Sequence, residues 1–474
     1  MRTQTTLTVV GAACALLLAG IKASAADALP DFFLPFPPRT EAAEAAPIPL
    51  RPLDDQSIPV PPRQRRTLPS GKPPFVLHEG DRVLFLGDEL LRGELEYGHL
   101  ETRLTSQYPD RNVTFRNLSW LTDHPLADPG SVDRLVPDSW LEPLLHHAVR
   151  IRPTIVFLGF GTDAAAAGEP GLEVFRGNLN RLIDGLLTSP EYPPPRLVIL
   201  GPLSRELATP ATGDADDHDD ELIHYAQALW EVAASRQCEF IDLYRWSQAE
   251  GRRSRALAQP DQEASRALTK EGLRLSQYGY WRMTLALERG LRWAPNHWRF
   301  GYLADGGLRD GQFGIELMQR SRSVNHVTAR TLEARLPTPN PPRILDTEPD
   351  SRPQCYIQIT GLDPGVYALE VDGELIVQGT QTEWARYQVI SQGPSWDQAE
   401  QLRQIIVSKN ALLLSRWRSE DPLQPPGDPA DAYVDELESQ ITTLRKPVPR
   451  TYELQRVVGR RNPRVPSAAS PPRT

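Results

Sequence analysis

The chain has 474 residues, more than one compact core usually takes, so we expect two or more domains. Its apolar content of 40% and charged content of 24% are ordinary for a soluble globular protein. The net charge of −9 argues against non-specific nucleic-acid binding, because that binding needs a basic face.

The chain begins with the pattern of a secretory signal peptide. Arg2 supplies a positive charge, residues 7–21 form a short apolar run, and residues 23–25 (ASA) fit a small-residue cleavage site. An uncleaved membrane anchor is the alternative, but the run is short for a span of ~20 residues. We therefore predict that residues 1–25 are a cleaved signal, and that the rest is exported to the periplasm or the extracellular space without a transmembrane span.

A Pro-rich segment follows the predicted signal. Residues 26–75 contain many prolines, with Ala, Arg and Asp between them, and lack a periodic apolar pattern. We expect this segment to be a disordered linker that leads to the first domain.

Residues 76–295 alternate between strand-like and helix-like patterns. Short apolar runs predict buried strands at residues 82–86, 113–118, 154–158, 196–200 and 239–243. Helical spacing of apolar residues separates them, at residues 94–107, 141–149, 175–187 and 222–235. This alternation predicts an α/β domain whose parallel sheet is covered on both faces, with the functional crevice at the carboxyl ends of the strands.

The pattern changes over residues 296–392, where short alternating segments predict a small antiparallel β unit. Its strands are expected at residues 357–360, 366–371 and 374–377, and Asp372-Gly373 is a hairpin signal between the last two. Two amphipathic helical patterns, at residues 398–417 and 434–444, then predict a helical tail over residues 393–454. Residues 455–474 are predicted to be disordered.

Two cysteines would remain after signal cleavage, Cys238 and Cys355. They lie far apart and have no CxxC or His-rich context, so we expect neither a metal site nor a cofactor. Export would permit one disulfide between them, and two free thiols are the alternative.

Several short motifs occur in a familiar order. They are residues 87–90 (GDEL), 97–104 (YGHLETRL), 115–118 (FRNL), 275–281 (LSQYGYW), 409–410 (KN), 416–418 (RWR) and 446–454 (KPVPRTYEL). Together they resemble the SGNH (GDSL-type) hydrolases, and in particular a group of exported proteins of environmental bacteria. The resemblance spans residues 80–454 and implies a flavodoxin-like fold for the α/β domain.

An SGNH hydrolase needs a nucleophilic Ser, oxyanion donors from a Gly amide and an Asn side chain, and an Asp-x-x-His motif. By resemblance, the positions of Ser, Gly, Asn, Asp and His correspond here to Glu89, Thr122, Asp163, Glu271 and Arg274. Only Glu271 keeps its chemical type. A carboxylate cannot reproduce serine chemistry, an Asp repels the oxyanion, and an Arg stays protonated and cannot act as a general base.

The nucleophile and base of an active relative meet across the crevice. We therefore predict that Glu89 and Arg274 form an ion pair within ~4 Å, and that Lys270 and Asp163 extend this charged cluster. Further crevice candidates are Asp88, Ser119, Asp123 and His124. Asp123 and His124 follow the second predicted strand and could supply an acid and a base, but a surface loop pair is the favoured interpretation of these two.

Other conspicuous residues have ordinary structural interpretations. His146-His147 on a predicted helix face different directions, so solvation or helix packing is favoured over metal binding. The acidic run at residues 214–221 lacks the spacing of a calcium loop. Tryptophan side chains could stack on sugars, but we expect core or interface packing for Trp281, Trp293 and Trp298.

Two functions follow from these observations. The favoured one is an exported, catalytically degenerate SGNH-like protein that serves as a binding or scaffold module for a carbohydrate or cell-envelope ligand. The alternative is an ester hydrolase, acting for example on acylated carbohydrates, that uses rearranged residues drawn from Asp88, Ser119, His124 and Glu271.

Overall fold

The structure is a computed structural model. It describes residues 72–119, 141–204, 216–257, 268–270, 274–294, 296–304, 312–323, 326–341, 355–418 and 429–457. All of them belong to one compact unit, Leu68–Thr474. The predicted signal peptide and most of the predicted linker lie outside the described residues. The linker ends earlier than predicted, because Phe75 is buried in the core and its amide donates to the carbonyl of Leu291 at 3.0 Å.

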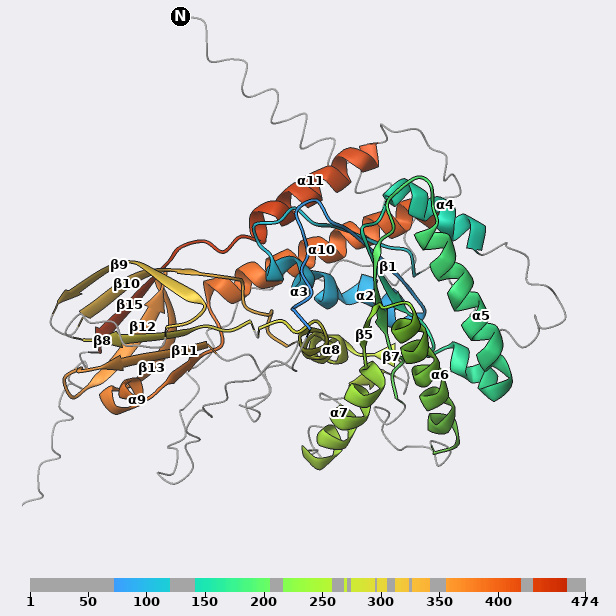
Figure 1. Ribbon diagram of the computed structural model, residues 1–474. Helices are drawn as coiled ribbons and strands as arrows, with labels where there is room; N and C mark the ends of the chain where they lie inside the picture. Colours follow the sequence, from blue (N-terminus) through green and yellow to red (C-terminus); the bar gives the residue numbers. More distant parts are fainter. Residues whose placement is uncertain are drawn as a thin grey trace, which may run out of the picture. The chain divides into compact units, whose positions relative to one another are not determined.

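The α/β domain contains the five predicted strands as one parallel sheet (Figure 1). They are β1 (Arg82–Gly87), β2 (Thr114–Asn117), β3 (Ile155–Gly159), β4 (Arg196–Leu200) and β5 (Glu239–Ile241). Their order, β2-β1-β3-β4-β5, is that of the flavodoxin-like fold, as predicted. Strand β1 is a continuous apolar run because both sheet faces are covered: Phe85 packs in one core and Leu84 in the other.

Helices flank both faces of this sheet (Figure 1). One core includes residues of α2 (Glu89–Tyr97), α3 (His99–Gln107) and α8 (Gln277–Gly290). The other includes residues of α4 (Leu141–Ile151), α5 (Gly168–Leu187) and α6 (Asp216–Ser235), with a 3-10 turn η4 (Ala164–Ala167) before α5. Helix α7 (Leu243–Leu257) follows β5, and a two-stranded ribbon of β6 (Thr269–Lys270) and β7 (Arg274–Leu275) precedes α8.

The single helix predicted at residues 94–107 is two helices, α2 and α3. Gly98 separates them with a φ of +65°, a conformation that favours glycine. The side chain of Glu94 in α2 caps the start of α3, where its Oε1 accepts from the amides of Leu100 at 2.6 Å and Glu101 at 3.1 Å. A local carboxylate thus satisfies backbone donors that a continuous helix would have used internally.

The β unit has two sheets that share one hydrophobic core. A three-stranded sheet has the order β14-β11-β8, from β8 (Arg299–Leu303), β11 (Cys355–Thr360) and β14 (Gln388–Ile390). A five-stranded antiparallel sheet has the order β13-β12-β15-β10-β9. Its strands are β9 (Ile315–Ser323), β10 (His326–Glu333), β12 (Val366–Val371), β13 (Glu374–Thr380) and β15 (Arg450–Arg456), and the short helix α9 (Gln381–Ala385) follows β13.

Strand β15 corrects the predicted domain boundaries. The segment predicted as a helical tail over residues 393–454 contains α10 (Pro394–Arg418) and α11 (Pro429–Leu444), but it ends in β15. This strand pairs with β12 on one side and β10 on the other, so it is the central strand of the sheet. The Pro and Arg content of this segment obscured its strand pattern. Because β15 joins this sheet, the β unit is built from two separate parts of the chain.

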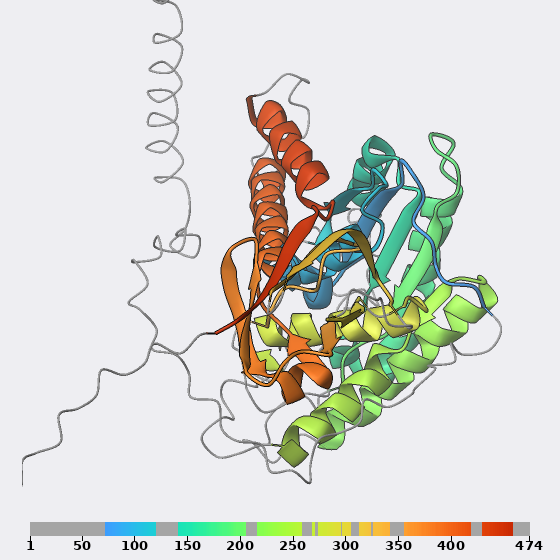
Figure 2. The same ribbon diagram turned by 90° about the vertical axis from the view of Figure 1, so that its left-hand side faces the viewer.

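Helix α10 packs against α11 and also against the α/β domain (Figure 2). Its Lys409 ammonium forms a buried ion pair with Glu101 of α3, and Asn410 Nδ2 donates to the same carboxylate at 3.1 Å. Arg403 donates to the carbonyl of Tyr97 at 2.6 Å, at the end of α2. Within the described ranges, no helix is long and apolar enough to cross a membrane.

Replacing Lys409 by Met tests how strongly this buried pair holds α10. The side chains of Lys409 and Glu101 are only 2% and 3% exposed, so the variant leaves a buried carboxylate without its cation. We expect the free energy of unfolding to fall by about 3–5 kcal/mol in urea titrations. Arg236→Met, which removes one partner of a more exposed pair with Asp184, should cost about 1 kcal/mol or less. Equal effects of the two variants would contradict this role for Lys409.

Candidate functional site

The candidate site lies at the carboxyl ends of β1 and β3, where two glycines let the strands approach closely. A Cβ on Gly87 would lie 2.4 Å from the carbonyl oxygen of Gly159, so no larger residue fits there. The amide of Asp88 donates to that same carbonyl at 3.0 Å. The close approach brings the start of α2 next to the loop that follows β3.

Asp88 ties these two segments together. Its side chain caps α2 by accepting from the amide of Leu90 at 3.3 Å, and it accepts from the amides of Thr162 at 3.0 Å and Asp163 at 3.2 Å. Burial and the neighbouring Asp163 carboxylate raise the pKa of Asp88 to about 7, although the three amides act in the opposite direction. This buried carboxyl group therefore titrates near neutral pH.

Glu89 is the first residue of α2, and two arginines bind its carboxylate. The Nε atom of Arg274 lies 3.3 Å from Glu89 Oε1, which confirms the predicted contact. The guanidinium of Arg92 also donates to Glu89 Oε2, with Nε at 2.9 Å. Glu89 is mostly buried, at 18% exposure, whereas the side chain of Arg274 is 63% exposed and reaches the surface.

Asp163, in the loop after β3, also contacts the start of α2. Its Oδ2 accepts from the backbone amide of Glu89 at 3.4 Å. Free amides at a helix N-terminus favour anions, and here the protein supplies its own carboxylate to one of them. Burial raises the pKa of Asp163 and the charge of Glu89 adds to this, while the Glu89 amide, Arg92 and Arg274 lower it.

This sheet and its site match a known family. Residues 85–282 match the model of the GDSL-like lipase/acylhydrolase family. This stretch is a GDSL-like lipase/acylhydrolase domain. The match contains Asp88, Glu89, Asp163 and Arg274, so the four residues that meet at the candidate site all belong to the GDSL-like domain.

The fold of the chain is similar to that of one solved structure beyond this stretch, and two esterase structures also match in part. A gut microbial diltiazem-metabolizing enzyme matches 81% of this chain and 99% of its own length, with a TM-score of 0.64 and 15% identity. An acetyl xylan esterase matches 44% of this chain and 96% of its own, with a TM-score of 0.33 and 14% identity. An acetylxylan esterase from Geobacillus stearothermophilus matches 46% and 96%, with a TM-score of 0.32 and 16% identity. No curated protein matches the chain.

Two other predicted crevice residues of the GDSL-like domain have different surroundings. Lys270 does not join the Glu89 cluster, because its ammonium lies 3.6 Å from Glu96 and donates to the hydroxyl of Tyr97. It pairs with Arg274 only through the backbone register of β6 and β7. Ser119 is buried after β2, and its amide donates to Asn117 Oδ1 at 2.9 Å. Thr122, Asp123, His124 and Glu271 lie outside the described residues.

The remaining sequence candidates have structural surroundings. Trp281, Trp293 and Trp298 are all buried. Trp293 and Trp298 belong to hydrophobic cores, as expected, and the indole N–H of Trp281 donates to the carbonyl of Pro339 at 2.8 Å. Cys238 and Cys355 are both free thiols. In the part of the chain that the structure describes, no group of three or more His, Cys, Asp or Glu side chains could hold a metal ion.

Arg92 is the one member of the GDSL-like site that the sequence analysis did not single out. The spacing of Glu89 and Arg92 could have indicated this contact, because residues three apart on a helix are neighbours and an acidic residue can pair with a basic one at that spacing. Local pairing of this kind is common on exposed helices, so the spacing alone did not mark Arg92 as part of a site.

Replacing Asp88 by Asn tests the buried carboxyl through the pH dependence of stability. The folded pKa of about 7 lies above the ordinary value of 3.8, so the folded state keeps a proton that the unfolded chain loses. The contribution of Asp88 to stability therefore declines as pH rises from about 4 to about 7, and is constant above that range. Thermal unfolding across pH 4–8 should show wild type losing stability relative to Asp88→Asn over this window.

Two comparisons isolate this effect. Burial also raises the pKa of Glu94 to about 8 and of Glu333 to about 7, but both groups are present in wild type and variant, so their contributions cancel. Glu96→Gln removes an exposed carboxyl from the same helix and should leave the wild-type pH profile unchanged. A constant stability difference between wild type and Asp88→Asn across the window would refute the raised pKa.

Proposed function

We propose that the protein is a catalytically degenerate member of the GDSL-like family, exported from the cell, which uses the altered site to bind a carbohydrate or cell-envelope ligand. The observation that carries this proposal is the state of Glu89. The residue that by resemblance stands in the nucleophile position is a carboxylate bound by Arg92 and Arg274. A carboxylate fixed by two guanidinium groups cannot perform the acyl transfer of a serine hydroxyl.

The surroundings of Asp163 support the same proposal. Acyl transfer needs fixed donors that stabilise the negative charge that develops on the tetrahedral intermediate. Here Asp163 accepts from the Glu89 amide at the start of α2. A second negative oxygen at this position would meet a carboxylate instead of a donor, and this electrostatic effect opposes the reaction.

Arg274, at the position of the general base, also supports the proposal. By resemblance it corresponds to the catalytic His, and an arginine guanidinium cannot replace an imidazole as a general base. Its exposed position and its contact with Glu89 suit a different role. A guanidinium beside carboxylates offers both donors and acceptors to a polar ligand, and the hydroxyl groups of a sugar can use both.

One observation favours the second candidate function, an ester hydrolase with rearranged residues. The raised pKa of Asp88, about 7, is suited to general acid–base work near neutral pH. Such an enzyme would draw its nucleophile and base from Asp88, Ser119, His124 and Glu271. The three backbone amides that bind Asp88 favour a structural role for it instead.

An activity assay separates the two functions. The purified chain is incubated with short acyl esters and with acetylated sugars, and hydrolysis is compared with buffer alone. We expect no turnover above background for two reasons. Asp163 places a carboxylate where the oxyanion needs a donor, and Arg274 cannot act as the general base. Turnover that disappears in Asp88→Asn or His124→Ala would establish a relocated active site. The double variant Glu89→Ser with Arg274→His would gain activity if these positions retain the ancestral geometry.

A binding assay tests the proposed ligand site directly. Cell-wall polysaccharide and acetylated xylan fragments are titrated into wild type, Arg274→Gln and Arg245→Gln. Arg245 is also paired with an acidic residue, but its side chain is 85% exposed on α7, so it is a matched control. We expect Arg274→Gln to weaken binding by about tenfold or more, since hydrogen bonds to charged groups contribute about 1.5–3 kcal/mol. Equal weakening by both variants, or no binding by wild type, would exclude this role for the site.

A further inference from the structure

The start of α10 is held by a carboxyl group in the core of the β unit, that of Glu333. Glu333 is the last residue of β10 and is 3% exposed. Its Oε1 atom accepts from the hydroxyl of Ser395, in the first turn of α10, at 2.7 Å. The same atom accepts from the hydroxyl of Tyr452, in β15, at 3.3 Å. One carboxyl oxygen thus joins the helix to two neighbouring strands of the five-stranded sheet.

The second oxygen of this carboxyl group has no such support. Glu333 Oε2 is buried and has no hydrogen-bond partner among the described residues. The indole N–H of Trp298 lowers the pKa of Glu333, but it lies outside hydrogen-bond geometry and is itself without a partner. A protonated carboxyl group leaves this oxygen neutral. An ionised one places charge on an oxygen that no donor binds, and this is costly in a buried core.

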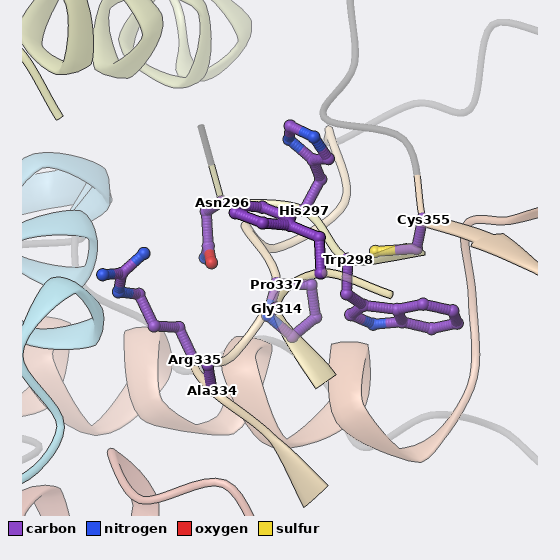
Figure 3. Close-up of a pocket in the computed structure, with 9 residues that line it drawn as sticks. Asn296, His297, Trp298, Gly314, Ala334, Arg335, Pro337 and Cys355 are labelled. Carbon is purple, nitrogen blue, oxygen red and sulfur yellow. The ribbon is translucent and has the colours of Figure 1, made fainter. Parts of the chain in front are cut away.

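The charged and titratable side chains around Glu333 do not offset this cost. Those of the described residues that interact with it are Arg450 and Tyr452 of β15 and Cys355 of β11. Cys355 and Trp298 both line a small cavity in this part of the core (Figure 3). Burial raises the pKa of Glu333 to about 7, although its hydrogen bonds and Arg450 act in the opposite direction. The folded protein therefore keeps a proton that an exposed glutamate would lose.

Arg450 holds the same helix start through contacts that do not involve Glu333. Its Nη2 atom donates to the carbonyl of Pro394 at 3.2 Å and to Gln398 Oε1 at 2.8 Å. Its Nη1 atom lies 3.0 Å from the carboxylate of Asp372. The first turn of α10 is thus bound to the β unit by two sets of contacts, and the set around Glu333 is the one that ionises near neutral pH.

We infer that Glu333 is a pH-sensitive switch that fixes or releases the first turn of α10. The protonated carboxyl group binds the hydroxyls of Ser395 and Tyr452 without burying a charge, and the turn stays closed. The ionised group favours opening of the turn, because opening lets water reach the carboxylate. Farther along, Lys409 and Arg403 bind α10 to the α/β domain, so the switch controls how firmly the β unit is held to the helix that joins the two.

The test is hydrogen–deuterium exchange of the full chain, expressed as protection factors so that the pH dependence of chemical exchange is removed. Between about pH 5.5 and about pH 8, the first turn of α10 should lose about tenfold or more of its protection. The reason is that opening returns the pKa of Glu333 from about 7 to its ordinary value of 4.5, so a rising pH favours the open turn. The middle of the same helix, around Lys409, is the internal reference and should change much less.

Three variants connect this change to Glu333. Glu333→Gln keeps an acceptor oxygen but cannot ionise, so its first turn should be well protected at both pH values. Ser395→Ala removes the hydroxyl that joins the helix to the carboxyl group, so its first turn should be poorly protected at both. Glu316→Gln removes an exposed carboxyl group from β9 and should behave as wild type does. Thermal unfolding at the lower pH confirms that each variant is folded, and Ser395→Ala keeps the test valid if Glu333→Gln is not.

Three results would overturn the inference. The first is equal protection of the first turn at both pH values in wild type. The second is a loss of protection with pH that persists unchanged in Glu333→Gln or in Ser395→Ala. The third is an equal loss around Lys409, which would assign the pH dependence to the whole fold. The switch uses no residue of the Glu89 site, so these results are independent of the function proposed for that site.

Discussion

The buried carboxyl group of Asp88 is the contact on which the candidate site depends. Asp88 follows β1, and its carboxyl group accepts hydrogen bonds from a backbone amide of α2 and from two backbone amides of the loop after β3. It therefore joins these three segments. The close approach of Gly87 to Gly159 makes this junction sterically feasible. This junction fixes the positions of Glu89 and Asp163. Glu89 follows Asp88 directly in the sequence, and the backbone amide of Asp163 itself donates to Asp88. The charge pattern of the site is thus imposed by backbone geometry.

Away from this junction, buried ionic contacts join helices at places where apolar residues often give equal or greater stability. Lys409 with Glu101 and Arg103 with Glu288 both lie between helices that are far apart in sequence. Buried pairs contribute little net stability, because desolvation offsets their attraction, but removing one partner is costly. Such contacts therefore favour one docking arrangement of α10 and α8 on α3 over other arrangements that an apolar surface would also permit.

The sequence predicted the parallel sheet well, because each of its strands is a continuous apolar run between turn signals. It also predicted the contact between Glu89 and Arg274, since opposite charges stood at two positions that a known family brings together. It failed where long-range pairing overrides local pattern. Strand β15 has a polar, Arg-rich sequence that only its two neighbours stabilise as a strand, and Lys270 turns to Glu96 because α2 presents a nearer carboxylate. Arg92 was missed because its partner is local and therefore unremarkable in the sequence.

The place of β15 has a consequence for the order in which the protein can fold. Strands β10 and β12 are made early, yet they do not pair with each other, and the strand that joins them is made only after α10 and α11. Until then, both strands have an unsatisfied edge, which is a template for pairing with other chains. Contacts between such distant segments also form slowly. The β unit therefore cannot mature ahead of the helices that follow it, and during synthesis the chain would need these edges to be shielded until β15 is made.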